Sequence, residues 1–133
     1  MEQAGVPIKE DYMKLGRFSV EEGYEKMKEL LTMKDRPTAV FLSNYETALG
    51  GVMAVNESEW SCPEDISIFG FDDLIVANAM QPKLWTIVQP MEMLCSKAVE
   101  LLLGRIQEKK ETAPMKLSFG VVIQEGGSIK SLE

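Results

Sequence analysis

Short apolar runs alternate with helical patterns along this chain, and this alternation constrains the fold more than any other feature of the sequence. Three of the runs have the length of a strand and are rich in β-branched residues: TAVFL (38–42), ISIF (66–69) and LWTIV (84–88). Near-continuous apolar runs of this kind are typical of strands that are buried on both faces of a sheet. The alternation therefore predicts an α/β fold in which helices flank both faces of a parallel sheet.

Apolar residues recur at helical spacing between and after these runs, and they predict three longer helices, over residues 20–33, 45–55 and 91–107. Weaker patterns predict a first strand over 11–15, a short helix that ends near Met80, and an extended C-terminal segment, 115–124, that bends at Gly120. The predicted order of elements is therefore β-α-β-α-β-α-β-α-β.

Two local signals refine the predicted helices. Ser19 is followed three residues later by Glu22, which is the pattern of a capping box at a helix N-terminus. Gly50 and Gly51 lie inside the second helix, where glycine lowers helix stability. We therefore expect another element to pack closely against that helix at the two glycines.

Net charge and histidine content limit the possible functions. The chain of 133 residues has a net charge of -7 and no histidine. An acidic chain repels phosphate backbones, so we expect no direct contact with nucleic acid. Without histidine the chain lacks Ser/His and Cys/His catalysis and the commonest metal ligand, and two cysteines are too few for a zinc site. We therefore expect no enzyme activity, no metal site and no cofactor.

Cysteine use and hydropathy bear on the compartment. Cys62 and Cys95 form no CxxC pair, which favours reduced thiols in a cytoplasmic protein, although a disulfide between them stays open. No apolar run approaches the roughly 20 residues of a membrane helix. We therefore expect no membrane partner.

Polar and aromatic side chains follow the predicted strands: Phe18, Ser43, Asn44, Tyr45, Phe71, Asp72, Asp73 and Gln89. In open parallel sheets, ligands bind beyond the carboxyl ends of the strands. Amides both donate and accept hydrogen bonds, and carboxylates accept two or more. An aromatic face beside them suits a sugar ring or a planar base. The pattern predicts a site for a small polar molecule, with no evident nucleophile.

Each of these residues also has a structural interpretation. Asp72 or Asp73 could cap a helix that starts at Leu74, and we favour this role for Asp73. For Asn44, capping and ligand binding are equally compatible with the pattern. An aromatic residue such as Phe18 is more often a core residue than a ligand platform. We interpret a further set of large side chains as structural: Tyr24, Trp60, Trp85 and the nine methionines.

Three stretches resemble the LacI/GalR family of bacterial transcription regulators: GRFSVEEGYEKMKELL (16–31), RPTAVFLSNYETALGGVMAV (36–55) and CPEDISIFGFDDLIVANAMQPKLWTIVQPMEMLCSKAVELLLGRI (62–106). The family pattern combines PTA and an apolar run before Asn-Asp, then GFDD or GYDD, then an apolar run before Gln-Pro. The ordered combination is far more specific than any one motif, and the resemblance covers nearly the whole chain.

The resemblance implies a type I periplasmic-binding-protein fold, in which two α/β lobes enclose a cleft. It implies that residues 1–88 and 120–130 belong to a truncated C-terminal lobe and that residues 90–116 belong to the N-terminal lobe, after a crossing at Gln89-Pro90. It also implies that a DNA-binding headpiece, an N-terminal lobe and an earlier strand and helix of the C-terminal lobe are absent from this chain.

The resemblance also suggests site residues. Asn44 matches an effector-facing Asn, Asp72 matches an Asp that binds effector hydroxyls or ring atoms, Phe18 matches an aromatic that packs on the ligand, and Gln89 matches the Gln at the crossing. Tyr45 departs from the Asp that is usual after the Asn, and it places a ring near the mouth of the cleft.

The function implied by the resemblance is effector sensing and dimerisation within a cytoplasmic regulator. A small polar effector, of which a sugar is our first expectation, would control DNA binding allosterically in a homodimer. Operator DNA would be contacted only through the headpiece.

Two other functions are compatible with parts of the pattern. A sugar-binding protein of a transport system can share the same fold. Asp72-Asp73 after a strand also resembles the acidic pair with which receiver domains bind Mg²⁺. Phe18, Asn44 and Gln89 at the other strand ends do not supply the acceptor Asp that a receiver domain needs, so we disfavour this last function.

Overall fold

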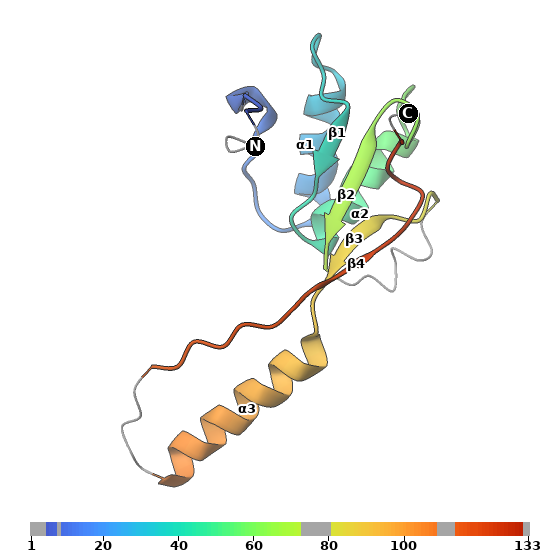
Figure 1. The fold of residues 1–133 in the computed structure, drawn as a ribbon. Helices are drawn as coiled ribbons and strands as arrows, with labels where there is room; N and C mark the ends of the chain where they lie inside the picture. Colours follow the sequence, from blue (N-terminus) through green and yellow to red (C-terminus); the bar gives the residue numbers. More distant parts are fainter. Residues whose placement is uncertain (1–4, 8, 73–80, 109–113, 132–133) are drawn as a thin grey trace.

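The computed structural model describes residues 5–7, 9–72, 81–108 and 114–131. In chain order its elements are the 3-10 turn η2 (Glu10–Tyr12), α1 (Val20–Leu31), β1 (Ala39–Phe41), α2 (Tyr45–Asn56), β2 (Ser67–Phe71), β3 (Trp85–Val88), α3 (Met91–Glu108) and β4 (Val122–Gln124). Figure 1 shows α1 and α2 beside the sheet, whereas α3 extends away from it.

The four strands form one sheet in the order β1-β2-β3-β4. Strands β1, β2 and β3 are parallel, with Phe41 opposite Phe69 and Phe71 opposite Ile87. Strand β4 returns antiparallel to β3 and places Ile123 opposite Ile87. The predicted α/β class is confirmed. The predicted parallel pairing holds for β1, β2 and β3, whereas the edge strand β4 is antiparallel.

Two glycines allow α1 and α2 to pack closely against each other. A β-carbon at Gly50 would lie 2.0 Å from the carbonyl oxygen of Val20, and one at Gly23 would lie 2.5 Å from the carbonyl oxygen of Thr47. Any larger side chain at either position would force the helices apart. The close packing predicted from Gly50 is therefore confirmed, with α1 as the neighbour.

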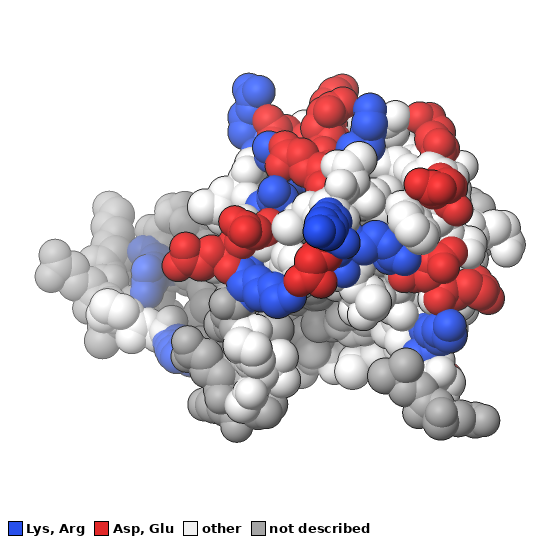
Figure 2. Space-filling view, turned by 90° about the horizontal axis from the view of Figure 1, so that it is seen from above, with Lys and Arg blue, Asp and Glu red and all other residues white. Residues whose placement is uncertain are grey.

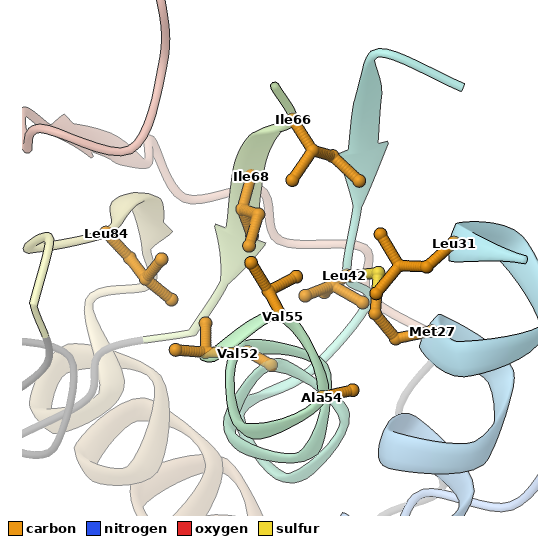
Figure 3. Close-up of a cluster of buried hydrophobic side chains, with 10 residues drawn as sticks. Met27, Leu31, Leu42, Val52, Ala54, Val55, Ile66, Ile68 and Leu84 are labelled. Carbon is orange, nitrogen blue, oxygen red and sulfur yellow. The ribbon is translucent and has the colours of Figure 1, made fainter. Parts of the chain in front are cut away.

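The core lies between this helix pair and one face of the sheet (Figure 3). The buried side chains come from α1, α2 and the strand region: Met27, Leu31, Leu42, Ala48, Val52, Ala54, Val55, Ile66, Ile68 and Leu84. Trp60 packs against this cluster, in agreement with its structural interpretation. Burial of these apolar groups drives formation of the helix–sheet unit.

The C-terminal segment is tied to the sheet through Ser128, which is fully buried. Its hydroxyl accepts a hydrogen bond from the Trp85 backbone amide at 2.9 Å and donates one to the carbonyl oxygen of Ile68 at 2.6 Å. The hydroxyl thus connects β2 with β3 at the end of the sheet opposite the candidate site.

The predicted first strand over residues 11–15 is wrong. Residues 10–12 form η2, and residues 13–17 have no regular structure. Tyr12 instead donates a hydrogen bond of 2.6 Å to the carbonyl oxygen of Asp35. A strand needs a neighbour to satisfy its backbone groups, and within the described residues β1 pairs only with β2.

Other predictions concern the faces of the sheet and the ends of the elements. The sequence predicts helices on both faces of the sheet, but among the described residues α1 and α2 pack on the same face and α3 packs on neither. The predicted short helix near Met80 and the predicted cap at Asp73 lie outside the described residues. Of the predicted extended segment 115–124, only β4 forms a strand.

Candidate functional site

Asp72 lies directly beyond the carboxyl end of β2, and the structure holds it from several sides. Its backbone amide donates to the carbonyl oxygen of Ile87 at 2.9 Å. Its carbonyl oxygen accepts from the Thr86 hydroxyl, also at 2.9 Å. Its φ of 84° is in the left-handed region, which non-glycine residues rarely adopt and Asp tolerates better than most. Backbone strain of this kind is common at binding sites.

Gln89 joins the Asp72 carboxylate from the end of β3. The Gln89 side-chain amide donates a hydrogen bond of 2.5 Å to Asp72 Oδ1. Both residues are half-buried. The two side chains predicted at the ends of neighbouring strands are thus brought together, and the pair offers amide and carboxylate oxygens that accept hydrogen bonds.

Asn44 follows β1 and serves as the N-cap of α2. Its Oδ1 accepts from the Thr47 backbone amide at 3.2 Å and from the Thr47 hydroxyl at 2.6 Å. Its amide group donates to Glu46 Oε2 at 3.0 Å. The capping interpretation is therefore confirmed, and a ligand role for Asn44 stays a prediction.

Tyr45 and Phe18 present exposed rings near the same end of β1. Tyr45 is 47% exposed, and its hydroxyl lies 3.3 Å from Glu46 Oε1. Phe18 is 68% exposed, so it is not a core residue. It lines a hollow of about 120 Å³ together with Phe41 and Ser43.

The register of the sheet places these groups along one edge. Leu42 donates its backbone amide to the carbonyl oxygen of Phe69, so the chain segments that follow β1 and β2 leave the sheet side by side. Neighbouring strands lie about 4.8 Å apart. Asn44, Asp72 and Gln89 therefore follow three adjacent strand ends, as the sequence pattern predicted. Gln89 and Asp72 share a hydrogen bond, whereas the hydrogen bonds of the Asn44 side chain go to Thr47 and Glu46.

Thr86 is a residue of the site that the sequence interpretation missed. Its side chain is 1% exposed in the middle of β3, and its hydroxyl fixes the carbonyl oxygen of Asp72. A single hydroxyl inside the apolar run LWTIV was the available signal, because a buried hydroxyl needs a hydrogen-bond partner.

The described residues give no sign of metal or membrane chemistry. No group of three or more histidine, cysteine or acidic side chains gathers there in a way that could hold a metal ion. No helix within the described ranges is both long and apolar enough to cross a bilayer. On the face shown in Figure 2, lysines and arginines are interspersed with acidic residues, and no broad basic patch forms on that face.

Comparisons with known proteins agree with the geometry. The family model for the periplasmic binding protein-like domain matches residues 1–129. The HTH-type transcriptional repressor PurR of Yersinia pestis (strain Pestoides F) is 40% identical over 111 residues, which cover 84% of this chain and 33% of the repressor. The chain thus spans about a third of the length of the curated relatives it matches.

Solved structures show the same arrangement. A LacI family regulator from Enterococcus faecium with bound ribose has a TM-score of 0.77 and 35% identity, and the match covers 88% of this chain and 42% of that one. A putative LacI regulator from Bacillus cereus subsp. cytotoxis has a TM-score of 0.93 over 99% of this chain and 46% of that one. Its 20% identity shows the shared fold alone. The resemblance drawn from the motifs is therefore confirmed, and the named relatives are a transcriptional repressor and transcriptional regulators rather than enzymes.

Proposed function

The chain belongs to the periplasmic binding protein-like domain family, as an effector-binding domain of the LacI/GalR type, and from this premise we propose that it forms part of the effector-sensing unit of a transcription regulator. Residues 1–88 and 120–130 form most of one lobe, and residues 90–116 belong to the other. The isolated position of α3 supports this division, because the helix leaves the sheet directly after Gln89 (Figure 1).

The proposed effector is a small polar molecule, with a neutral sugar as the first candidate. The observation that carries this proposal is the Asp72–Gln89 pair beyond adjacent strand ends. Sugar hydroxyls donate to carboxylate and amide oxygens, and the exposed rings of Phe18 and Tyr45 offer apolar faces nearby. The ribose bound by the Enterococcus faecium regulator supports the same ligand class.

In this proposal the effector changes the arrangement of the two lobes and thereby the affinity of a homodimer for operator DNA. DNA is contacted by a headpiece in another part of the regulator, in the cytoplasm. The net charge of -7 supports a role for this chain away from the DNA. The named repressor relatives favour regulation over sugar transport.

The test uses the full-length product of the gene that encodes this chain. Genomic DNA fragments that bind the protein are selected first. The affinity of the protein for these fragments is then measured at increasing concentrations of D-ribose and of a panel of other neutral sugars. We expect at least one sugar to change the DNA affinity by roughly 5- to 150-fold, as is typical of allosteric coupling. A protein that retains no DNA, or whose DNA affinity no sugar alters, would contradict the proposal.

A further inference from the structure

Gln89 occupies the point at which the chain leaves the sheet and begins α3. It follows Val88, the last residue of β3, and precedes Pro90. Its carbonyl oxygen accepts a hydrogen bond of 2.9 Å from the Met91 backbone amide, in the first turn of α3. The backbone of Gln89 is therefore part of the helix start, while its side chain turns to Asp72.

Asp72 is the fixed partner in this pair. Its backbone amide and carbonyl are both bonded to β3, at Ile87 and Thr86, and Thr86 is itself buried. Asp72 therefore cannot move unless the ends of β2 and β3 also move. The Gln89 amide donates to a carboxylate, and hydrogen bonds to ionised acceptors are shorter and stronger than neutral ones.

Helix α3 has little else to hold its direction within the described residues. Its residues 91–107 are all exposed or half-buried, and it makes no extensive contact with another described element. Figure 1 shows the helix clear of the sheet along its whole length. The short connection at Gln89-Pro90 and the segment that returns in the opposite direction to β4 link it to the sheet.

We propose that Gln89 is a positioning residue: its side-chain amide joins the Asp72 carboxylate to the start of α3, so that the direction of α3 depends on the Asp72–Gln89 hydrogen bond. The same bond fixes the rotamer of the Asp72 carboxylate. If the proposed function holds, an effector hydroxyl that binds Asp72 competes with Gln89, and the competition transmits binding to α3. This consequence rests on the proposed function, whereas the positioning role does not.

The two cysteines and two tryptophans allow a direct test in this chain of 133 residues. Cys95 lies on α3 and is exposed, and Trp85 lies on β3. In a Cys62→Ser, Trp60→Phe background, an acceptor dye on Cys95 reports its distance from Trp85 by time-resolved energy transfer. No ligand is present, so the result is independent of whether the protein binds a sugar.

Two variants and one matched control separate positioning from general structural damage. Gln89→Met keeps the side-chain length but cannot donate, and we expect a broader distance distribution than in the background protein. Gln89→Glu can form the bond to Asp72 only when one of the two carboxyls is protonated. We therefore expect a broad distribution at pH 8 and a narrow one at pH 5. Lys97→Met, which removes only the Lys97–Glu100 ion pair within α3, leaves the distribution narrow at both pH values.

A Gln89→Met distribution as narrow as that of the Lys97→Met control would overturn the proposal. If Gln89→Met fails to fold, as judged by circular dichroism, Gln89→Glu alone tests the positioning role. Its distance distribution is then compared at two pH values in the same protein. The same distribution at pH 5 and pH 8 in Gln89→Glu would then overturn the positioning role. The positioning role would also be overturned if lowering the pH from 8 to 5 narrowed the distance distribution of the background protein as much as that of Gln89→Glu.

Discussion

At the level of single residues, two side chains of the same type can differ in burial and reactivity. The two cysteines illustrate this point. Cys62 is half-buried and its thiol lies 3.5 Å from the carbonyl oxygen of Ser128, whereas Cys95 is exposed on α3. Burial, helped by the nearby Glu64 carboxylate, raises the pKa of the Cys62 thiol to about 11. Only the thiolate is nucleophilic, so this thiol is protected near neutral pH.

We predict that one equivalent of Ellman's reagent reacts rapidly at pH 8 and that the second reacts much more slowly. Because the folded-state pKa of Cys62 is raised, its reactivity increases as the pH approaches 11. In Cys95→Ser the fast phase disappears and the slow phase remains. Two phases of equal rate in the folded protein would contradict the prediction.

Site residues differ in how far sequence alone could identify them. The strand ends placed Asn44, Asp72 and Gln89 on one edge, because strand position follows from a local apolar pattern. The left-handed backbone of Asp72 and the contribution of Thr86 could not be predicted in this way. Both depend on hydrogen bonds between β2 and β3, which are set by register rather than by neighbours along the chain.

At the scale of elements, the contact between α1 and α2 is the most exacting feature. Gly50 faces the backbone of Val20 without room for a β-carbon, while Gly104 on α3 has no atom within 4 Å of such a position. The same substitution therefore has opposite effects at the two sites.

We predict that Gly50→Ala lowers the free energy of unfolding by about 1–3 kcal/mol, the usual cost of overpacking. Gly104→Ala, the matched control, raises it by up to about 1 kcal/mol, because alanine favours the helix more than glycine does. Urea denaturation followed by circular dichroism measures both. Equal effects of the two substitutions would show that the helices do not meet at Gly50.

Helix caps provide a second test at this scale. Ser19 accepts a hydrogen bond of 3.2 Å from the Glu22 backbone amide at the start of α1. Ser19→Ala leaves that amide without its cap and is expected to cost about 1 kcal/mol, whereas Ser19→Asp retains the acceptor and restores most of the loss. The same denaturation experiment compares the variants, and an unchanged stability in Ser19→Ala would contradict a capping role.

Elements with local signals were predictable and the remaining ones were not. Helices α1 and α2 were predicted from caps and periodicity, and their observed bounds differ from the predicted ones by at most two residues. The stretch 11–15 carried only a weak strand pattern, and it forms no strand. Strand formation depends on a pairing strand that is distant along the chain, and the sequence of residues 11–15 does not show whether such a strand is present.

At the scale of the whole molecule, apolar side chains remain exposed on α3 and near β4. On α3, Leu102 is 59% and Ile106 is 62% exposed, and on β4 Val122 is 66% exposed. Exposed apolar surface of this kind favours association. The proposed second lobe and the proposed dimer would both cover such surface in a regulator.

We predict that this chain self-associates with rising concentration in sedimentation equilibrium. The double variant Leu102→Lys, Ile106→Lys places charges on α3 and is expected to weaken the association by at least tenfold. Arg105→Lys on the same helix keeps the charge and serves as the control. A chain that stays monomeric at every concentration would contradict the expectation.

We expect Asp72 to be the hydrogen-bond acceptor for a small polar effector in a LacI/GalR-type regulator. The most direct test is calorimetric titration of the full-length regulator with the sugar found to act on its DNA binding, in the natural protein and in Asp72→Ala. Hydrogen bonds to a charged group contribute about 1.5–3 kcal/mol, so we expect a roughly 10- to 150-fold loss of affinity in Asp72→Ala. Asp65→Ala removes a carboxylate that accepts hydrogen bonds from the Ser61 backbone amide and hydroxyl, and this variant should bind the sugar as the natural protein does. Unchanged affinity in a folded Asp72→Ala protein would show that Asp72 does not bind the effector.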